Sequence, residues 1–218
     1  MEKVRVKICG IRTLDEAECA VEAGAVMLGF NFWPASPRYI KPGAAKLIID
    51  KLPGGVSSIG VFVNESAEKI IDINRETGLS AIQLHGDESP AECKNLSGLS
   101  VIKAMRVGEG FRVERICEYG VDTVLLDASL KGRYGGTGVT FDWSIAARAR
   151  AYAKIILAGG LNAENVKEAI QIARPFAVDV CSGVEAAPGR KDFAKMREFI
   201  SIVTEWKGVS GGGMYEQR

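Results

Sequence analysis

Cys9 and Asp127 are residues whose types and places in the chain suit proton transfer. Each ends an apolar stretch, KVRVKIC at residues 3–9 and VDTVLLD at residues 121–127. A thiol works as a base or nucleophile when it has thiolate character, which nearby positive charge promotes. A carboxylic acid donates a proton near neutral pH when a dry, apolar pocket disfavours its charged form. The two residues therefore suit general acid–base chemistry. A buried packing thiol and an ion-paired or loop-capping carboxylate are the structural alternatives.

Arg38 and His85 are candidates for contacts to a substrate. Arg38 lies in the sequence NFWPASPRYI at residues 31–40, and a guanidinium can hold a carboxylate through two parallel hydrogen bonds. Phe32 and Trp33 in the same stretch could face an aromatic ring. His85 is the only histidine of the chain and ends the sequence QLH. We give it a supporting role, with a hydrogen-bonded structural role as the alternative, just as a solvated loop arginine is the alternative for Arg38.

Two glycine-containing stretches predict a phosphate site. ILAGGLNAENV covers residues 156–166, and VDVCSGVE covers residues 178–185. Glycine lets a backbone approach a ligand closely, and free N–H groups at the start of a helix attract anions. The candidate phosphate-binding residues are Gly159, Gly160, Ser182 and Gly183. In the second stretch we expect Asp179 to point away from Cys181 and to be structural.

Alternating strands and helices must position these residues. Short apolar runs rich in Val, Ile and Leu alternate with amphipathic stretches along the chain. The predicted strands are Val4–Cys9, Val26–Phe32, Ser58–Val63, Ala81–His85, Val101–Arg106, Thr123–Asp127, Lys154–Ala158 and Ala177–Cys181. The predicted helices begin near Leu14, Gly43, Ser66, Ser89, Gly110, Phe141, Ala163 and Asp192. Helix N-caps are expected at Thr13, Asn64 and Asn162, because these side chains accept hydrogen bonds from the N–H groups of a helix start.

Eight strand–helix units predict an α/β fold, a single (β/α)8 TIM barrel with a parallel sheet. An open doubly wound sheet is the alternative, but no GxGxxG follows the first strand, where a dinucleotide site needs one. Functional groups of such barrels gather at the carboxyl ends of the strands. Because side chains alternate along a strand, Lys7 and Cys9 share the face that points into the barrel. There Lys7 either promotes the thiolate or pairs with a buried carboxylate.

The composition limits the classes of partner and the number of domains. The chain has 218 residues, 47% of them hydrophobic, and a formal net charge of +1. The length suits one barrel domain over residues 1–207, and we expect residues 208–218, GVSGGGMYEQR, to form a flexible tail. Scattered Lys and Arg argue against nucleic acid, and no apolar run is long enough to span a membrane. Five cysteines, one histidine and no CxxC pair argue against a disulfide framework and a metal site, so a cytoplasmic location fits best.

Nine short motifs follow one another along residues 3–206. They are KICGI at 7–11, SPRYI at 36–40, GVFVN at 60–64, QLHGDE at 83–88, LLDAS at 125–129, GGTG at 135–138, FDW at 141–143, LAGGLNAENV at 157–166 and DVCSGVE at 179–185. Together they resemble the phosphoribosylanthranilate isomerase family of tryptophan biosynthesis. The ordered set is highly specific, although no single motif is.

The resemblance implies a (β/α)8 barrel and an Amadori rearrangement, which is an aldose–ketose isomerisation. The implied substrate is N-(5-phosphoribosyl)anthranilate, a phosphorylated small molecule, and the product is 1-(2-carboxyphenylamino)-1-deoxyribulose 5-phosphate. The family motifs imply Cys9 as the catalytic base, Asp127 as the catalytic acid and Arg38 as the residue that binds the anthranilate carboxylate. The implied phosphate loops fall on Gly159, Gly160, Ser182 and Gly183. No metal or organic cofactor is implied, and we expect a monomer or a homodimer.

Cys181 departs from the family pattern, which usually has serine at this place. Strand eight neighbours strand one in a closed barrel, so we expect a second thiol near Cys9 and oxidative inactivation through Cys9, with a Cys9–Cys181 bridge as one route. Three alternatives need other residues at the strand ends. A histidine-pathway aminoaldose isomerase uses two aspartates, and indole-glycerol-phosphate synthase uses a lysine acid and a glutamate base. A phosphate-binding protein without catalysis needs neither Cys9 nor Asp127.

Overall fold

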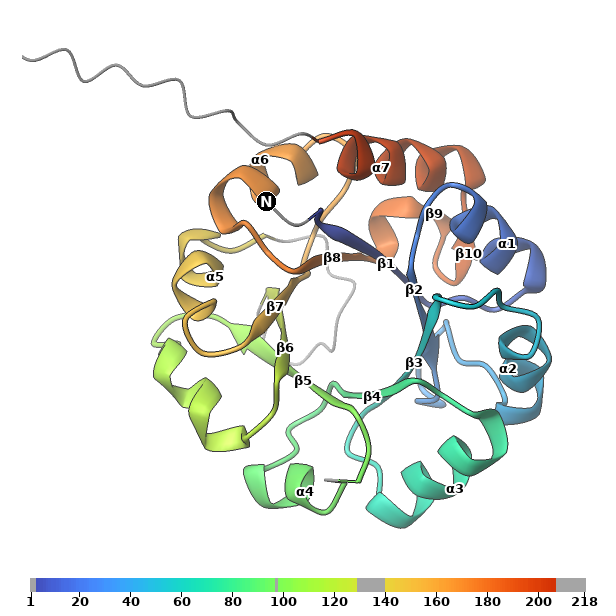
Figure 1. Cartoon of the computed structure of the whole chain (residues 1–218), viewed down its shortest axis with the longest axis horizontal. Helices are drawn as coiled ribbons and strands as arrows, with labels where there is room; N and C mark the ends of the chain where they lie inside the picture. Colours follow the sequence, from blue (N-terminus) through green and yellow to red (C-terminus); the bar gives the residue numbers. More distant parts are fainter. Residues whose placement is uncertain (1–2, 97, 129–139, 207–218) are drawn as a thin grey trace, which may run out of the picture.

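The computed structural model describes residues 3–96, 98–128 and 140–206, and in this part of the chain eight parallel strands close into a barrel. The strands are β1 (Arg5–Cys9), β2 (Met27–Asn31), β3 (Ser57–Phe62), β4 (Ala81–Leu84), β5 (Val101–Val107), β6 (Thr123–Ala128), β7 (Lys154–Leu157) and β8 (Ala177–Val180). They pair in chain order, and β1 closes the ring by pairing with β8. Figure 1 shows this inner ring inside a layer of helices, so the predicted (β/α)8 TIM barrel is confirmed.

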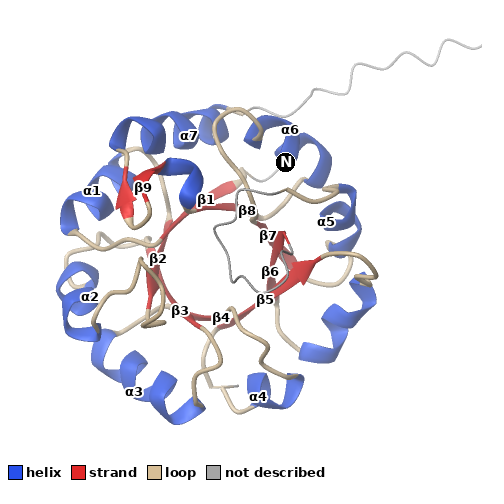
Figure 2. Ribbon diagram, turned by 180° about the vertical axis from the view of Figure 1, so that it is seen from behind, coloured by secondary structure: helices blue, strands red, loops and turns tan. Residues whose placement is uncertain are grey.

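A helical segment follows each strand and covers the outside of the barrel. These segments are α1 (Leu14–Glu22), α2 (Pro42–Ile49), α3 (Ala67–Thr77), α4 (Pro90–Lys94), the 3-10 helix η1 (Val113–Tyr119), α5 (Ser144–Ala149), α6 (Val166–Ala173) and α7 (Phe193–Glu205). Between β8 and α7 lie a short 3-10 helix, η2 (Ser182–Val184), and an antiparallel hairpin of β9 (Glu185–Ala187) and β10 (Arg190–Lys191). Figure 2 shows β9 beside α1.

The helix N-caps are partly as predicted. Thr13 caps α1, and its hydroxyl and the Glu16 carboxylate form a capping box. The predicted cap at Asn64 is wrong, because α3 begins after Ser66, whose hydroxyl accepts an N–H of the first turn. Asn64 instead has a left-handed backbone with a φ of 50°, and its side chain accepts a hydrogen bond from the backbone N–H of Asp87. Its side chain therefore joins the loops after β3 and β4.

Three predicted helix starts are too early. The helix α5, expected near Phe141, and the helix α6, expected near Ala163, each begin three residues later. In both cases a side-chain oxygen accepts backbone N–H groups and folds the preceding residues into a turn, with Asp142 before α5 and Asn162 before α6. The helix expected near Gly110 is the 3-10 helix η1, which has no side-chain cap.

The interior of the barrel has an apolar layer and a polar layer. The apolar layer consists of Ile59, Ile102, Ala104, Leu125, Ile156, Ala158 and Ala177. A larger buried cluster fills the space between the strands and the helices. Toward the carboxyl ends of the strands, the buried inward side chains are polar and include Lys7, Gln83, Asp127 and Asp179. The polar side chains therefore lie at the carboxyl ends of the strands, and the apolar layer fills the barrel interior below them.

Asp179 points into the barrel beside Lys7. Its Oδ1 accepts a hydrogen bond from Lys7 Nζ at 2.8 Å, and the two residues are register partners on β8 and β1. Lys7 is fully buried. The prediction that Asp179 points away from Cys181 is wrong, because residues two apart in a strand lie on the same face. The ion pair also confirms the reading of Lys7 as the partner of a buried carboxylate.

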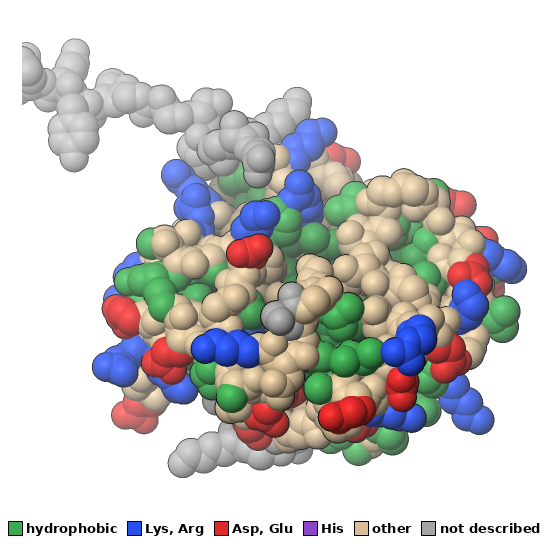
Figure 3. Space-filling view, turned by 60° about the horizontal axis from the view of Figure 1, so that its bottom comes forward, with side chains coloured by type: hydrophobic (Ala, Val, Ile, Leu, Met, Phe, Trp, Pro, Cys, Tyr) green, Lys and Arg blue, Asp and Glu red, His purple; other side chains and the backbone are tan. Residues whose placement is uncertain are grey.

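The surface carries both signs of charge. On the face seen in Figure 3, Lys and Arg side chains are interspersed with Asp and Glu side chains. Among the helices that the structure describes, none is long and apolar enough to cross a membrane. The predicted tail at 208–218 and the GGTG motif at 135–138 lie outside the described residues.

Candidate active site

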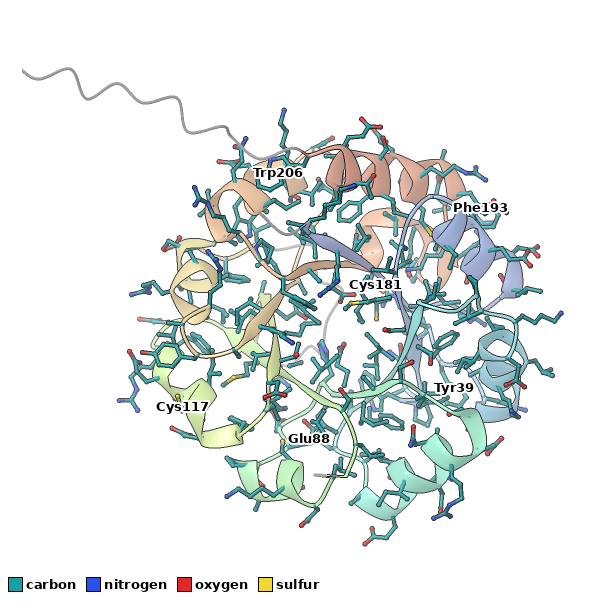
Figure 4. All side chains as sticks on the ribbon, viewed as in Figure 1. Tyr39, Glu88, Cys117, Cys181, Phe193 and Trp206 are labelled. Atoms are coloured by element: carbon teal, nitrogen blue, oxygen red, sulfur yellow. The ribbon has the colours of Figure 1, made fainter. Side chains whose placement is uncertain are left out.

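One pocket opens at the carboxyl ends of the barrel strands. Its lining includes Cys9, Asn31, Trp33, Ser36, Arg38, Gln83, His85, Asp127, Gly159, Gly160, Asp179, Cys181 and Ser182. The structure therefore brings together all the predicted site residues except Gly183, which follows Ser182 in η2 without lining the pocket. Figure 4 shows Cys181 at the inner ring of strands, whereas Cys117 lies in the outer layer of helices.

Cys9 ends β1 and is 8% exposed, with its sulfur beside a second thiol. The hydrogen bond from Cys181, and then the charges of Lys7 and Lys191, hold the pKa of Cys9 well below its ordinary value, although burial opposes them. The same hydrogen bond and burial raise the pKa of Cys181 well above its ordinary value. The two shifts favour Cys9 as the thiolate of the pair and Cys181 as the thiol that donates to it.

The ion pair of Lys7 and Asp179 places a fixed positive charge beside the thiolate. Burial acts to lower the pKa of Lys7, but the Asp179 carboxylate and the Cys9 thiolate raise it above its ordinary value. Burial raises the pKa of Asp179 to about 6, against the lowering effect of Lys7. Both partners are therefore charged at neutral pH. Removing one of them leaves the other buried and unpaired, which typically destabilises a fold by about 3–5 kcal/mol.

Asp127 is the penultimate residue of β6, and its side chain is the first of three that contact one another in a row. Its Oδ2 lies 3.3 Å from His85 Nε2, and His85 Nδ1 lies 2.8 Å from Gln83 Nε2. In this arrangement Nδ1 accepts a hydrogen bond, and Nε2 carries the ring proton that faces Asp127. Gln83 Oε1 is buried and has no hydrogen-bond partner among the residues that the structure describes. If the Gln83 amide turns, its Oε1 can accept a hydrogen bond from a protonated His85 Nδ1, and His85 Nε2 can then accept a proton from Asp127. The three side chains therefore accommodate both protonation states of Asp127.

Arg38 is held against the wall of the pocket. Its Nε and Nη2 donate to the two carboxylate oxygens of Glu185 at 2.8 and 2.7 Å. This contact raises the pKa of Arg38 above its ordinary value against the effect of burial. A Cβ on Gly10 would lie 2.9 Å from Arg38 Cδ, so the aliphatic part of Arg38 packs directly on the glycine backbone. The alternative of a solvated loop arginine is wrong, because the Arg38 side chain is only 14% exposed.

The two glycine loops lie beside Asp127 and against each other. Gly159 and Gly160 have φ angles of 84° and 65°, which side chains rarely adopt. A Cβ on Gly159 would lie 2.9 Å from Asp127 Oδ1, and a Cβ on Gly183 would overlap the carbonyl oxygen of Leu161. Only glycine therefore allows this approach of the two backbones, which form one wall of the pocket.

Glu88, in the motif QLHGDE, supports the site from outside the pocket. Its carboxylate accepts hydrogen bonds from the backbone N–H groups of Asn64 and Gly86 at 2.9 and 3.0 Å. It also accepts one from Lys103 Nζ at 2.6 Å. The network joins the loops after β3 and β4 to strand β5, so it fixes the strand end that carries His85.

Sequence reasoning missed Gln83, Glu185 and Lys191. Gln83 could have been found from alternation, because it lies two residues before His85 and shares its face. Glu185 belongs to the DVCSGVE motif, but a carboxylate in a sequence does not reveal its cationic partner. Lys191 reaches the site from the hairpin of β9 and β10, whose two short strands are too brief to give a pattern. 

The five cysteines are free thiols in the structure. Among the described residues, no group of three or more His, Cys, Asp and Glu side chains is arranged to hold a metal ion. The pocket contains a thiol whose pKa is held low, a carboxyl group in contact with His85, a guanidinium and a glycine-rich wall. That set can move protons on a bound molecule and hold negative groups at its two ends.

Comparisons with known proteins agree with this chemistry. Residues 6–202 match the family model described as N-(5'-phosphoribosyl)anthranilate (PRA) isomerase. A PRA isomerase of Geobacter sulfurreducens is 49% identical over 203 residues, which cover 93% of this chain and 100% of that protein. The crystal structure of PRA isomerase from Thermotoga maritima has a TM-score of 0.86 at 46% identity, covering 92% of this chain and 98% of the other. A PRA isomerase complex with reduced 1-(o-carboxyphenylamino)-1-deoxyribulose 5-phosphate has a TM-score of 0.82 at 44% identity, with the same coverage.

Proposed function

The chain belongs to the N-(5'-phosphoribosyl)anthranilate isomerase family, and we propose from this premise which of its residues carry out the reaction. The enzyme converts N-(5-phosphoribosyl)anthranilate into 1-(2-carboxyphenylamino)-1-deoxyribulose 5-phosphate in tryptophan biosynthesis. The observation that carries the assignment of roles is that Cys9, whose pKa is held low, and Asp127, whose carboxyl group contacts His85, lie in one pocket.

Asp127 is the general acid of the first step. Its proton goes to the ring oxygen of the ribose, the bond from that oxygen to C1 breaks, and the nitrogen lone pair forms an iminium ion. His85 can exchange a proton with Asp127 across the 3.3 Å contact between Nε2 and Oδ2, which restores the acid for the next cycle. The structure thus supports an acid whose proton is replaced from inside the pocket.

Cys9 is the general base of the second step. The positive nitrogen acidifies the proton on C2 of the sugar, and the Cys9 thiolate removes it to give an enolamine. Protonation of C1 and loss of the hydroxyl proton at C2 then give the ketone. The acid and the base need opposite protonation states at one pH. The hydrogen bond from Cys181 and the charge of Lys7 meet this need by favouring the thiolate.

Two anchors orient the substrate around these groups. Arg38 binds the anthranilate carboxylate at one end, and the loops of Gly159, Gly160, Ser182 and Gly183 bind the phosphate at the other. Holding both ends of the sugar fixes C1 and C2 between acid and base, which is a large part of the advantage of an enzyme over a solution reaction. Proton transfers complete the rearrangement, and they require no metal or organic cofactor.

Residues 1–207 form the proposed isomerase domain, and residues 208–218 have no proposed role. A structure of monomers generated from the dimeric enzyme of Thermotoga maritima agrees with a monomer or a homodimer for this chain as well. We place the enzyme in the cytoplasm, which is supported by its five free cysteines.

The function is tested with substrate made immediately before use. We expect the purified protein to accelerate the decay of the fluorescence of N-(5-phosphoribosyl)anthranilate by many orders of magnitude over the buffer reaction. The product is identified by its mass and by reduction with borohydride. Decay at the buffer rate, by a protein with a cooperative melting transition, would overturn the assignment.

Oxidation is expected to inactivate the enzyme reversibly through the two thiols. The Cys9 thiolate takes an oxygen atom from hydrogen peroxide, which gives a sulfenic acid and releases hydroxide. The Cys181 thiol then attacks this sulfur, so that a disulfide forms and water leaves. We expect peroxide to remove activity and a dithiol reductant to restore it, with the loss of two hydrogen atoms seen by intact mass.

The control for oxidation is Cys181→Ser, which keeps a hydrogen-bond donor beside Cys9. In this variant the sulfenic acid has no thiol to react with, so continued exposure drives it to the irreversible sulfinic acid. Reductant should then restore little activity. If Cys181→Ser left the rate of inactivation and its recovery unchanged, the bridge would be excluded.

A further inference from the structure

Glu185 contacts Arg38, and none of the roles proposed above involves this contact. Its carboxylate is 4% exposed and receives both hydrogen bonds of one edge of the Arg38 guanidinium. A guanidinium has a second edge, made by Nη1 and the other N–H of Nη2. No hydrogen bond to Nη1 occurs within the described residues, and Arg38 lines the pocket. The edge that Glu185 leaves open is therefore the edge offered to a ligand.

Lys191 holds Glu185 from the other side. Its ammonium group is fully buried and lies 3.3 Å from Glu185 Oε1 and 3.0 Å from the carbonyl oxygen of Cys181, to which it donates. The backbone N–H of Lys191 donates to Glu16 on α1, which anchors the hairpin to the barrel. Burial acts to raise the pKa of Glu185, but Arg38 and Lys191 hold it below its ordinary value. Glu185 is thus a carboxylate between two cations.

The charge of this cluster matches a single anionic group. Arg38 and Lys191 carry one positive charge each, and Glu185 carries one negative charge, so the cluster has a net charge of +1. A Cβ on Gly189 of the same hairpin would overlap the carbonyl oxygen of Pro37, so the hairpin packs tightly on the loop that carries Arg38. The arrangement fixes both the direction and the charge of the guanidinium before any ligand arrives.

We propose that Glu185, held by Lys191, is a positioning residue that aims the free edge of Arg38 at the carboxylate on the aromatic ring of the substrate. The pair thereby contributes to specificity for an anionic ring. This inference rests on the proposed role of Arg38. A bidentate contact depends on alignment, and a guanidinium that must be ordered during binding loses affinity for its carboxylate.

The test separates positioning from charge. Replacing Glu185 alone would also raise the net charge beside the substrate, so the informative variant is Glu185→Gln/Lys191→Met, which keeps the net charge at +1. We expect its KM for N-(5-phosphoribosyl)anthranilate to rise about tenfold. With N-(5-phosphoribosyl)aniline, which lacks the carboxylate, KM should stay close to that of the unaltered enzyme. Lys191 also helps to lower the pKa of Cys9, so any fall in kcat should be the same for both substrates. An unchanged KM for the analogue also shows that the variant is folded.

Two further variants complete the design. Arg38→Met should raise KM for the carboxylated substrate alone, and adding it to the double variant should produce no further rise. The matched control is Lys46→Met/Asp50→Asn, which removes an exposed ion pair on α2 and should change neither substrate. If Arg38→Met leaves KM unchanged, the proposed role of Arg38 fails. If Arg38→Met raises KM and Glu185→Gln/Lys191→Met does not, or if the double variant raises KM for both substrates equally, only the positioning role fails.

Discussion

Replacing Cys9 by alanine should lower kcat by about 10³-fold or more, with KM close to that of the unaltered enzyme. The proposed anchors of the substrate are Arg38 and the glycine loops, so loss of the thiol should remove the proposed base and leave binding in place. Within the pocket lining, Asp179 is bound to Lys7, and Asp127 has the proposed role of the acid, so we expect neither to replace the thiolate. Steady-state kinetics give kcat, and titration with the reduced product measures binding. A normal kcat in Cys9→Ala would remove Cys9 from the mechanism.

The pH profile provides a control for this role. A base works in its deprotonated form, so kcat/KM should fall on the acid side as the thiolate gains a proton. Because the pKa of Cys9 is held well below its ordinary value, this fall should occur well below the range of an ordinary thiol. Cys181→Ala removes the largest lowering influence, which raises the pKa of Cys9 and moves the acid limb to higher pH. Cys117→Ala, an exposed thiol on η1, should leave the limb in place.

Replacing Asp127 by asparagine should lower kcat by about 10³-fold as well, again with a small change in KM. Asparagine has the shape of aspartic acid and can still contact His85, but its amide cannot give a proton to the ring oxygen. The substrate would then bind and remain a closed ring. Product formation measured by mass gives kcat, and the reduced product gives binding.

Two results would contradict the acid role of Asp127. One is a normal kcat in Asp127→Asn. The other is a large rise in KM with kcat preserved, which would make Asp127 a binding residue. His85→Asn is the companion variant, because it removes the proton exchange across the 3.3 Å contact and leaves Asp127 in place. We expect it to lower kcat by less than Asp127→Asn does.

The sequence allowed the barrel and the carboxyl ends of its strands to be predicted closely. Strand ends such as Cys9 and Asp127 were within one residue of the observed ends, because apolar runs between helices mark parallel strands clearly. Helix starts were less accurate. The side chains of Asp142 and Asn162 accept backbone N–H groups in turns, which look like helix starts in a sequence but delay them in the structure.

The contacts between site residues could not be predicted from the sequence. Arg38 was predicted as a ligand for a substrate carboxylate, but its partner Glu185 lies 147 residues away along the chain. No local pattern reports such a pairing, since it depends on how β8 and the hairpin of β9 and β10 approach the loop after β2. The orientation of Asp179, in contrast, follows from the alternation of side chains along a strand, which places Asp179 and Cys181 on the same face.

The ion pair of Lys7 and Asp179 can form only late in the synthesis of the chain. Its partners are 172 residues apart, and two further groups that favour the Cys9 thiolate, Cys181 and Lys191, also come from the last quarter of the chain. Cys9 is among the first residues synthesised, but its reactive form needs neighbours that emerge near the end of translation. The nascent chain therefore carries an ordinary, weakly reactive thiol until the ring closes. The pairing of β1 with β8 thus completes the surroundings that lower the pKa of Cys9.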